Sequence, residues 1–127
     1  MNKQIVHKIL IAEDCTFEIL FIKMQLDSAK KKGLLKNFEL TIVKSVDDLI
    51  KAMKEKTFSL IFLDHNLEFG GKIEIETIEN ILADGKIHIN NILSTTGCDD
   101  FKEKLIEKGI EHLEKNKIIP YIINRFI

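Results

Sequence analysis

The sequence predicts an α/β fold in which a parallel sheet is covered by helices on both faces. Residues 58–63 form a short apolar run, which is typical of a strand buried on both faces. Stretches with strand character and stretches with helical periodicity alternate five times along the chain. Single polar residues follow several of the strand stretches, and parallel sheets place their ligands at that end of their strands.

The composition is that of one globular domain. The chain has 127 residues, of which 45% are hydrophobic and 31% are charged, enough for a core and a charged surface. The formal net charge of -1 argues against direct nucleic-acid binding, for which a basic footprint is expected. Cys15 and Cys98 lack metal-type spacing. We expect a single domain over residues 1–127 with no signal peptide, no membrane partner and a cytoplasmic location.

The first half of the chain predicts two strand–helix units. Residues 5–12 are the first strand, and Thr16 is expected to cap the next helix, which ends at Gly33. Residues 38–43 alternate and form a second strand near an edge, and Ser45–Asp48 has the form of a capping box. The apolar positions that we interpret as the core stripe of the first helix are Phe17, Leu20, Phe21, Met24 and Ala29, widened by Ile19, Ile22 and Leu26.

The second half continues the alternation. It contains, in order, a strand at 58–64, a helix at 73–82, a strand at 87–93, a helix opened by a capping box at Asp100 and Glu103 and ended by Gly109, a strand at 110–114, and a helix with Pro120 in its first turn. Right-handed crossovers then place helices on both faces of the sheet. A doubly wound sheet of this size commonly has the strand order 2-1-3-4-5, with its switch point between strands 1 and 3.

Polar residues of complementary kinds follow four of these strands. Glu13 and Asp14 follow the first strand, Asp64 the third, Thr95 the fourth and Lys115 the fifth. If strands 1 and 3 are neighbours, three carboxylates converge and require a cation or raised pKa values. Oxygen ligands without a His or Cys partner select Mg²⁺. A metal beside a nucleophilic carboxylate, a hydroxyl and an ammonium group is the equipment for phosphoryl transfer.

This ordered set resembles the receiver domain of the two-component response regulators, the family that includes the single-domain chemotaxis regulators. The likeness covers almost the whole chain and implies a flavodoxin-like, three-layer α/β/α fold. It implies that Asp64 is the phosphoacceptor, charged from a phosphohistidine with Mg²⁺ as cofactor. It also implies that Glu13, Asp14, Asp64 and the backbone carbonyl of Asn66 hold the metal.

The same resemblance implies further roles and partners. Thr95 would be the switch hydroxyl and Lys115 the phosphate-sensing cation. His112 falls where the family usually has a Tyr or Phe that changes rotamer with activation. The partners would be a histidine kinase or histidine phosphotransfer protein and a downstream protein target. The protein would be a phosphoacceptor with at most self-catalysed phosphorylation and dephosphorylation, and not otherwise an enzyme.

Several departures from the family pattern leave alternatives open. Lys115 is followed by Asn116 instead of Pro, which leaves the cis form of that bond open. The segment before Lys115 is one residue short, so either Ser94 or Thr95 could be the switch hydroxyl. The last helix is short, and its face is either thin or shared with a second chain in a homodimer. The main alternative function is that of a pseudo-receiver, which keeps the receiver fold but acts as an interaction module without phosphorylation. A haloacid-dehalogenase-type phosphatase is disfavoured, because Asn66 stands where its general acid is needed.

Overall fold

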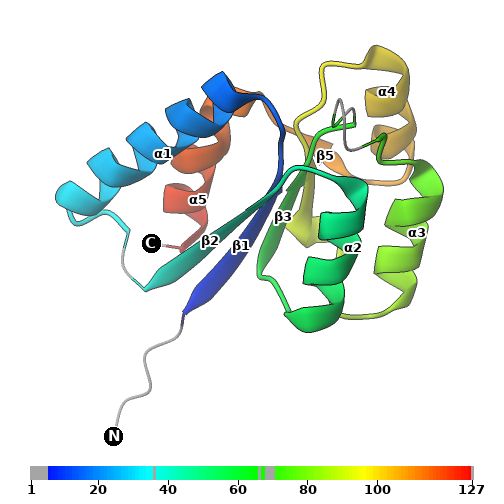
Figure 1. Ribbon diagram of the computed structural model, residues 1–127, viewed down its shortest axis with the longest axis horizontal. Helices are drawn as coiled ribbons and strands as arrows, with labels where there is room; N and C mark the ends of the chain where they lie inside the picture. Colours follow the sequence, from blue (N-terminus) through cyan, green and yellow to red (C-terminus); the bar gives the residue numbers. More distant parts are fainter. Residues whose placement is uncertain (1–5, 36, 66, 68–70, 127) are drawn as a thin grey trace, which may run out of the picture.

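The computed structural model describes residues 6–126, apart from residues 36, 66 and 68–70 (Figure 1). The described strands are β1 (His7–Ala12), β2 (Phe38–Val43), β3 (Leu60–Leu63), β4 (Ile92–Ser94) and β5 (Glu111–His112). The described helices are α1 (Thr16–Lys31), α2 (Val46–Glu55), α3 (Ile75–Ala83), α4 (Asp99–Glu107) and α5 (Ile118–Phe126), together with the short 3₁₀ helices η2 (Ile89–Asn91) and η3 (Lys115–Lys117). Strand and helix alternate as the sequence predicted.

The strands form one parallel sheet in the order β2-β1-β3-β4-β5. The predicted order is therefore confirmed, with β1 and β3 as direct neighbours. Their last residues are level, because Ala12 pairs with Leu63. The residues that follow both strands consequently leave the sheet at the same edge, at the top of Figure 1.

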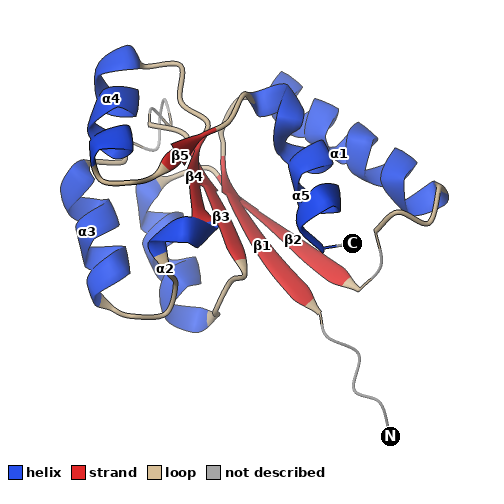
Figure 2. Cartoon of the chain, turned by 180° about the vertical axis from the view of Figure 1, so that it is seen from behind, coloured by secondary structure: helices blue, strands red, loops and turns tan. Residues whose placement is uncertain are grey.

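Helices cover both faces of the sheet, which gives three layers (Figures 1 and 2). Helices α1 and α5 lie on one face, and α2, α3 and α4 lie on the other. Alternate strand residues point to opposite faces. Ile9 and Leu60 pack into the core under α1 and α5, whereas Leu10 and Ile61 pack under the other three helices. These side chains are fully buried, and each contributes about 1.5–3 kcal/mol relative to exposure.

The buried face of α1 differs from the expectation. Ile19, Ile22, Leu26 and Ala29 face the sheet, as the sequence allowed. The expected core stripe, however, lies mainly outside: its exposed members are Phe17, Leu20, Phe21 and Met24. The helix carries two apolar stripes about two residues apart, and its packing on β1 and α5 selects the one that is rich in Ile. The prediction that the other stripe belongs to the core was wrong.

One of the three predicted helix caps is present, and two are not. Ser45 caps α2 by accepting a hydrogen bond from the amide of Asp48 at 3.1 Å, as expected. The predictions for Thr16 and Asp100 were wrong, since the N-cap residues of α1 and α4 are Cys15 and Cys98 and neither side chain makes a cap bond.

The fourth strand is shorter than predicted. Residues 89–91 form the turn η2, which His88 closes by accepting a hydrogen bond from the amide of Asn90 at 3.1 Å. The ladder with β3 therefore begins only at Ile92. The His88 side chain offers the backbone a local hydrogen bond that competes with a sheet ladder, and this accounts for the difference.

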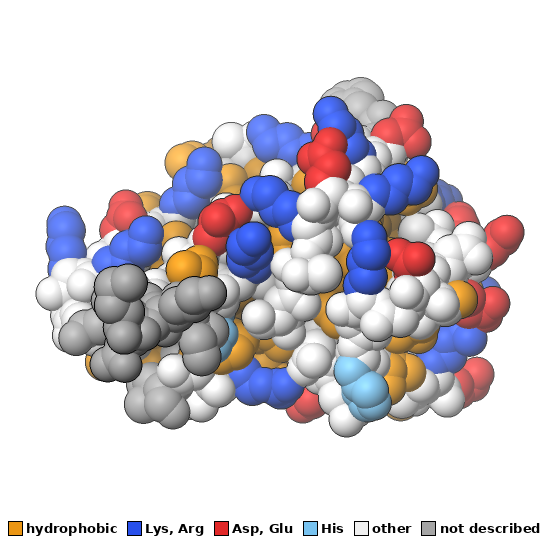
Figure 3. Space-filling model, turned by 90° about the horizontal axis from the view of Figure 1, so that it is seen from below, with side chains coloured by type: hydrophobic (Ala, Val, Ile, Leu, Met, Phe, Trp, Pro, Cys, Tyr) orange, Lys and Arg blue, Asp and Glu red, His pale blue; other side chains and the backbone are white. Residues whose placement is uncertain are grey.

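The surface mixes both signs of charge. On the face shown in Figure 3, basic and acidic side chains alternate around small apolar areas, which agrees with the net charge of -1. Among the helices of the described residues, none has the length and the apolar run needed to cross a membrane.

Candidate functional site

The polar residues that follow the strands meet at the edge where β1 and β3 end. Hydrogen bonds continue the ladder beyond the strands, from the amide of Asp64 to Ala12 (3.2 Å) and from the amide of Thr95 to Leu63 (2.9 Å). Carboxylate oxygens of Glu13, Asp14 and Asp64 all lie within 4.8 Å of one another. The convergence of three carboxylates that the sequence predicted is therefore present.

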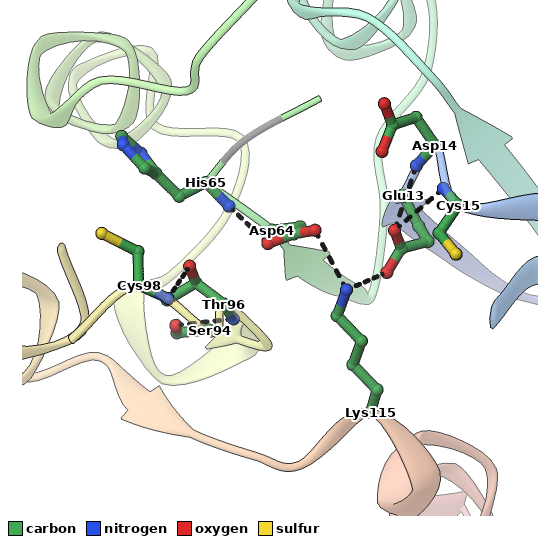
Figure 4. A network of polar contacts seen from close by, with 9 residues as sticks. All are labelled: Glu13, Asp14, Cys15, Asp64, His65, Ser94, Thr96, Cys98 and Lys115. Atoms are coloured by element: carbon green, nitrogen blue, oxygen red, sulfur yellow. Dashed lines mark hydrogen bonds and ion pairs between the residues drawn. The ribbon is translucent and has the colours of Figure 1, made fainter. Parts of the chain in front are cut away.

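Glu13 is the most deeply buried of the three acids, with an exposed fraction of 1%. One carboxylate oxygen, Oε2, accepts hydrogen bonds from the amides of Asp14 and Cys15, both at 3.1 Å, in the turn between β1 and α1 (Figure 4). Burial raises the pKa of the Glu13 carboxyl, and the contacts with Lys115 and the Cys15 amide offset this only in part. The side chain thus fixes the turn between β1 and α1 and presents its second oxygen to Lys115.

Lys115 bridges two of the acids from η3, which follows β5. Its Nζ lies 2.7 Å from Glu13 Oε1 and 3.1 Å from Asp64 Oδ2 (Figure 4). Burial alone would lower the pKa of Lys115, but its hydrogen bonds and the charges of Glu13 and Asp64 outweigh burial and raise it. The ammonium group is therefore charged and shared between two carboxylates. The Lys115–Asn116 peptide bond is trans.

Asp64 follows β3 and is 8% exposed. Its Oδ1 accepts a hydrogen bond from the amide of His65 at 2.8 Å, while its Oδ2 faces Lys115. The carboxylate is therefore oriented by one fixed donor on each oxygen. Asp14, the third acid, is partly exposed, and its carboxylate points away from Lys115 in Figure 4.

The donor set fits a hard divalent cation. Three carboxylates within 4.8 Å face only one ammonium group in the cluster, so negative charge remains to be balanced. Mg²⁺ binds such all-oxygen sites through one or two carboxylates and keeps several waters. Asp14 and Asp64 would hold the ion, with Glu13 beside them. The predicted fourth ligand, the backbone of Asn66, lies outside the described residues.

Hydroxyl groups line the end of β4. Ser94, Thr95 and Thr96 are all buried. The structure places Nδ1 of His112 at 3.4 Å from Ser94 Oγ, since the two residues are register partners in β4 and β5. Thr95, the predicted switch hydroxyl, instead lines the surface hollow described next, as does Lys115. Burial and the charge of Lys102 lower the pKa of His112.

A hollow of about 530 Å³ opens between the ends of β4 and β5 and the start of α1, and Lys115 is the residue that it shares with the acid cluster. Thr95, Thr96 and Lys115 line it from the site, and Phe17 and Phe21 of α1 line it from the other side. Phe17 is 83% exposed. Any group that enters this hollow and reaches Lys115 therefore contacts an apolar wall formed by α1.

Sequence reasoning missed several residues of this site. The contact between Ser94 and His112 follows from the register of β4 and β5, which periodicity alone does not give. The apolar wall was missed because Phe17 and Phe21 were assigned to the core. The sequence signal for the wall was present, since α1 has more apolar positions than one buried face can hold.

No protein-family model and no curated protein matches the sequence of the chain. Solved structures do match its fold. A response regulator receiver domain from Methylobacillus flagellatus has a TM-score of 0.67 and 18% identity, over 94% of this chain and 98% of that chain.

Two further structures agree with the first. A chemotaxis response regulator from Vibrio cholerae has a TM-score of 0.67 and 13% identity, over 97% of this chain and all (100%) of that chain. A response regulator from Thermotoga maritima has a TM-score of 0.64 and 15% identity, over 95% and 94% of the two chains. With the five-stranded order 2-1-3-4-5 and its two helical layers, the chain has the flavodoxin-like α/β fold of response regulator receiver domains.

Proposed function

We propose that this protein is a phosphoryl-accepting signalling domain that takes a phosphoryl group on Asp64 from a phosphohistidine. The observation that carries the proposal is the bridge of Lys115 between Glu13 and Asp64, with Asp14 within 4.8 Å. This arrangement combines a recessed nucleophile, a fixed cation and spare negative charge for a metal. Bound Mg²⁺ would supply charge neutralisation for the phosphoryl oxygens.

Each of the residues Asp64, His65, Lys115 and Thr95 has a separate role in the proposed transfer. One oxygen of Asp64 attacks phosphorus, the P–N bond of the phosphohistidine breaks, and the leaving imidazole nitrogen keeps the electron pair. The amide of His65 holds Oδ1, so Oδ2 is the oxygen that exchanges Lys115 for phosphorus. Lys115 then pairs with a phosphoryl oxygen, and the Thr95 hydroxyl donates to another.

The shape of the hollow supports a protein as phosphodonor. Asp64 is recessed, and its ion-pair partner Lys115 lines a hollow whose other wall is formed by Phe17 and Phe21 on the exposed side of α1. An exposed apolar stripe of this kind marks a surface for protein contact. The proposed donor is a histidine kinase or histidine phosphotransfer protein that covers this stripe while its phosphohistidine enters the hollow. The output is contact with a second, downstream protein.

The main alternative is an interaction module that is not phosphorylated. The same Lys115 bridge supports it, because the ammonium group already neutralises much of the charge of Glu13 and Asp64 without a metal. The two functions differ in whether Asp64 reacts.

Intact-mass spectrometry with phosphoramidate and Mg²⁺ tests the proposal. The expected result is one added phosphoryl group on the native protein and none on Asp64→Asn. The matched control is Asp27→Asn, which changes an exposed aspartate of α1 and should be labelled like the native protein. Absence of an adduct on the native protein, or an adduct that persists in Asp64→Asn, would leave the interaction module as the better description.

A further inference from the structure

His65 makes four contacts, and the proposed phosphoryl transfer uses only the one between its amide and Asp64. Its amide donates to Asp64 Oδ1 at 2.8 Å, and its carbonyl accepts from the amide of Ile73 at 2.7 Å. Its ring nitrogen Nδ1 lies 2.8 Å from the carbonyl of Ile73. The ring stacks on that of Phe101, with centroids 4.0 Å apart and planes inclined by 28°. One residue therefore contacts the acceptor carboxylate, the segment before α3, and α4.

The ring of His65 has a fixed orientation. A carbonyl oxygen can only accept, so Nδ1 carries the proton and donates to Ile73. Ile73 is fully buried, and its backbone is bound by both the ring and the carbonyl of His65. Rotating the ring would break the Nδ1 bond and the stack together. In Figure 4 the ring points away from Lys115, so it takes no direct part in the acid cluster.

The partner of this ring is one of the two anchors of α4. The buried side chains of α4 are Phe101, in its first turn, and Leu105. An aromatic pair of this geometry adds stability beyond the area that it buries. A helix of nine residues with two buried side chains depends strongly on each of them. The first turn of α4 therefore packs on the ring of His65. The backbone amide of the same residue is bound to Asp64.

We infer that His65 is a positioning residue that couples the state of the Asp64 carboxylate to the first turn of α4. The inference rests on the proposed function, because the state to be transmitted is phosphorylation of Asp64. A new bond at Oδ2 changes the charge and orientation of the carboxylate whose Oδ1 binds the His65 amide. The ring moves with that amide and carries the change to Phe101. Coupling between two sites is reciprocal. The stack of His65 on Phe101 therefore also affects the phosphorylation equilibrium of Asp64.

Hydrogen exchange of α4, followed by peptide mass spectrometry, tests the coupling. The probe is beryllofluoride with Mg²⁺ as a phosphoryl mimic, and fluorine NMR shows independently whether it is bound. In the native protein the mimic should change exchange in the α4 peptide. In His65→Ala, basal exchange of α4 should be about three- to tenfold faster, and the response to bound mimic should be lost.

Three further variants separate coupling from general damage. His65→Phe keeps a stacking ring and should restore the basal protection of α4. His88→Ala removes another histidine, the cap of η2, and should behave like the native protein. Asp64→Ala should change exchange in α4 of the native protein but not in the His65→Ala background. This last comparison needs no phosphoryl mimic.

The outcomes distinguish the two proposals. If the mimic fails to bind the native protein, the proposed function fails, while the Asp64→Ala comparison still decides the coupling. If the mimic binds and α4 of His65→Ala responds as in the native protein, the coupling is overturned. It is also overturned if Asp64→Ala has the same effect with and without His65, or if His65→Phe exchanges like His65→Ala.

Discussion

The acid cluster sets three carboxylates against one ammonium group, and this imbalance determines what single substitutions do. Lys115 is bound to Glu13 and Asp64, and Glu13 is almost fully buried. Removing one partner of a buried ion pair leaves an uncompensated charge, which costs more than the pair contributes. Glu13 and Lys115 therefore behave as a unit, and the effect of replacing one residue depends on whether the other is present.

Lys115→Met is expected to lower the free energy of unfolding by about 2–3 kcal/mol, because Glu13 loses its counter-charge. The loss is smaller than for a fully buried pair, since the Lys115 side chain is 26% exposed. Urea unfolding at neutral pH measures it. Adding Glu13→Gln should recover most of the loss, and an unrecovered double variant would contradict the assignment. Lys117→Met, an exposed lysine of the same 3₁₀ turn, should change stability by less than about 0.5 kcal/mol.

His112 should make stability depend on pH. Its pKa is lowered by burial and by Lys102, so the folded chain takes up a proton at lower pH than the unfolded chain. The contribution of His112 is complete above the unfolded pKa of about 6.5 and is lost as the pH falls towards and through the lowered folded pKa. Urea unfolding at about pH 7.5 and pH 5.5 should show a smaller difference in His112→Gln than in the native protein. Equal differences would contradict this assignment.

Helix α1 has two apolar faces with different tasks. The inner face carries Ile22 against the sheet, and the outer face carries Phe17 beside the hollow. Ile22→Ala should lower the free energy of unfolding by about 2–5 kcal/mol, because it leaves a cavity in the core. Phe17→Ala should change it by less than about 0.5 kcal/mol. Urea unfolding of both variants measures the contrast, and a large loss in Phe17→Ala would show that the outer stripe is part of the core.

The elements that could be predicted from the sequence are those whose signal is local. Ser45 caps α2 because its hydroxyl reaches an amide three residues later. The apolar run of β3 fits only a strand that is buried on both faces of the sheet. The buried face of α1 could not be chosen, because two apolar stripes compete and only packing on the sheet decides between them. The start of β4 was misjudged, because His88 and Asn90 form a local turn that apolar spacing does not reveal.

At the scale of the whole molecule, the sheet brings the candidate site together. The meeting of Glu13, Asp14 and Asp64 could be predicted, because parallel strands that are neighbours end at a common edge. The stack of His65 on Phe101 could not, since it depends on how α4 packs against a loop distant in sequence. The strand order therefore follows from general topology, whereas contacts between side chains on different layers require coordinates.

Mg²⁺ should stabilise the whole domain, since the proposed metal site exists only in the folded chain. At ten times the dissociation constant the gain is about 1.4 kcal/mol, which corresponds to a rise in Tm of about 5 °C for a domain of this size. Thermal unfolding followed by circular dichroism, with and without MgCl₂ after chelator treatment, measures the shift. KCl at matched ionic strength controls for charge screening.

Asp14→Asn provides the matched variant for this measurement. Without metal it should be more stable than the native protein by about 1 kcal/mol, because one of three neighbouring negative charges is removed. With metal it should show little further gain, because a ligand is lost. The higher stability of Asp14→Asn without metal and the loss of its response to Mg²⁺ should occur together, since both arise from the same excess of negative charge. A native protein whose Tm ignores Mg²⁺, or an Asp14→Asn variant that responds fully, would contradict the metal site.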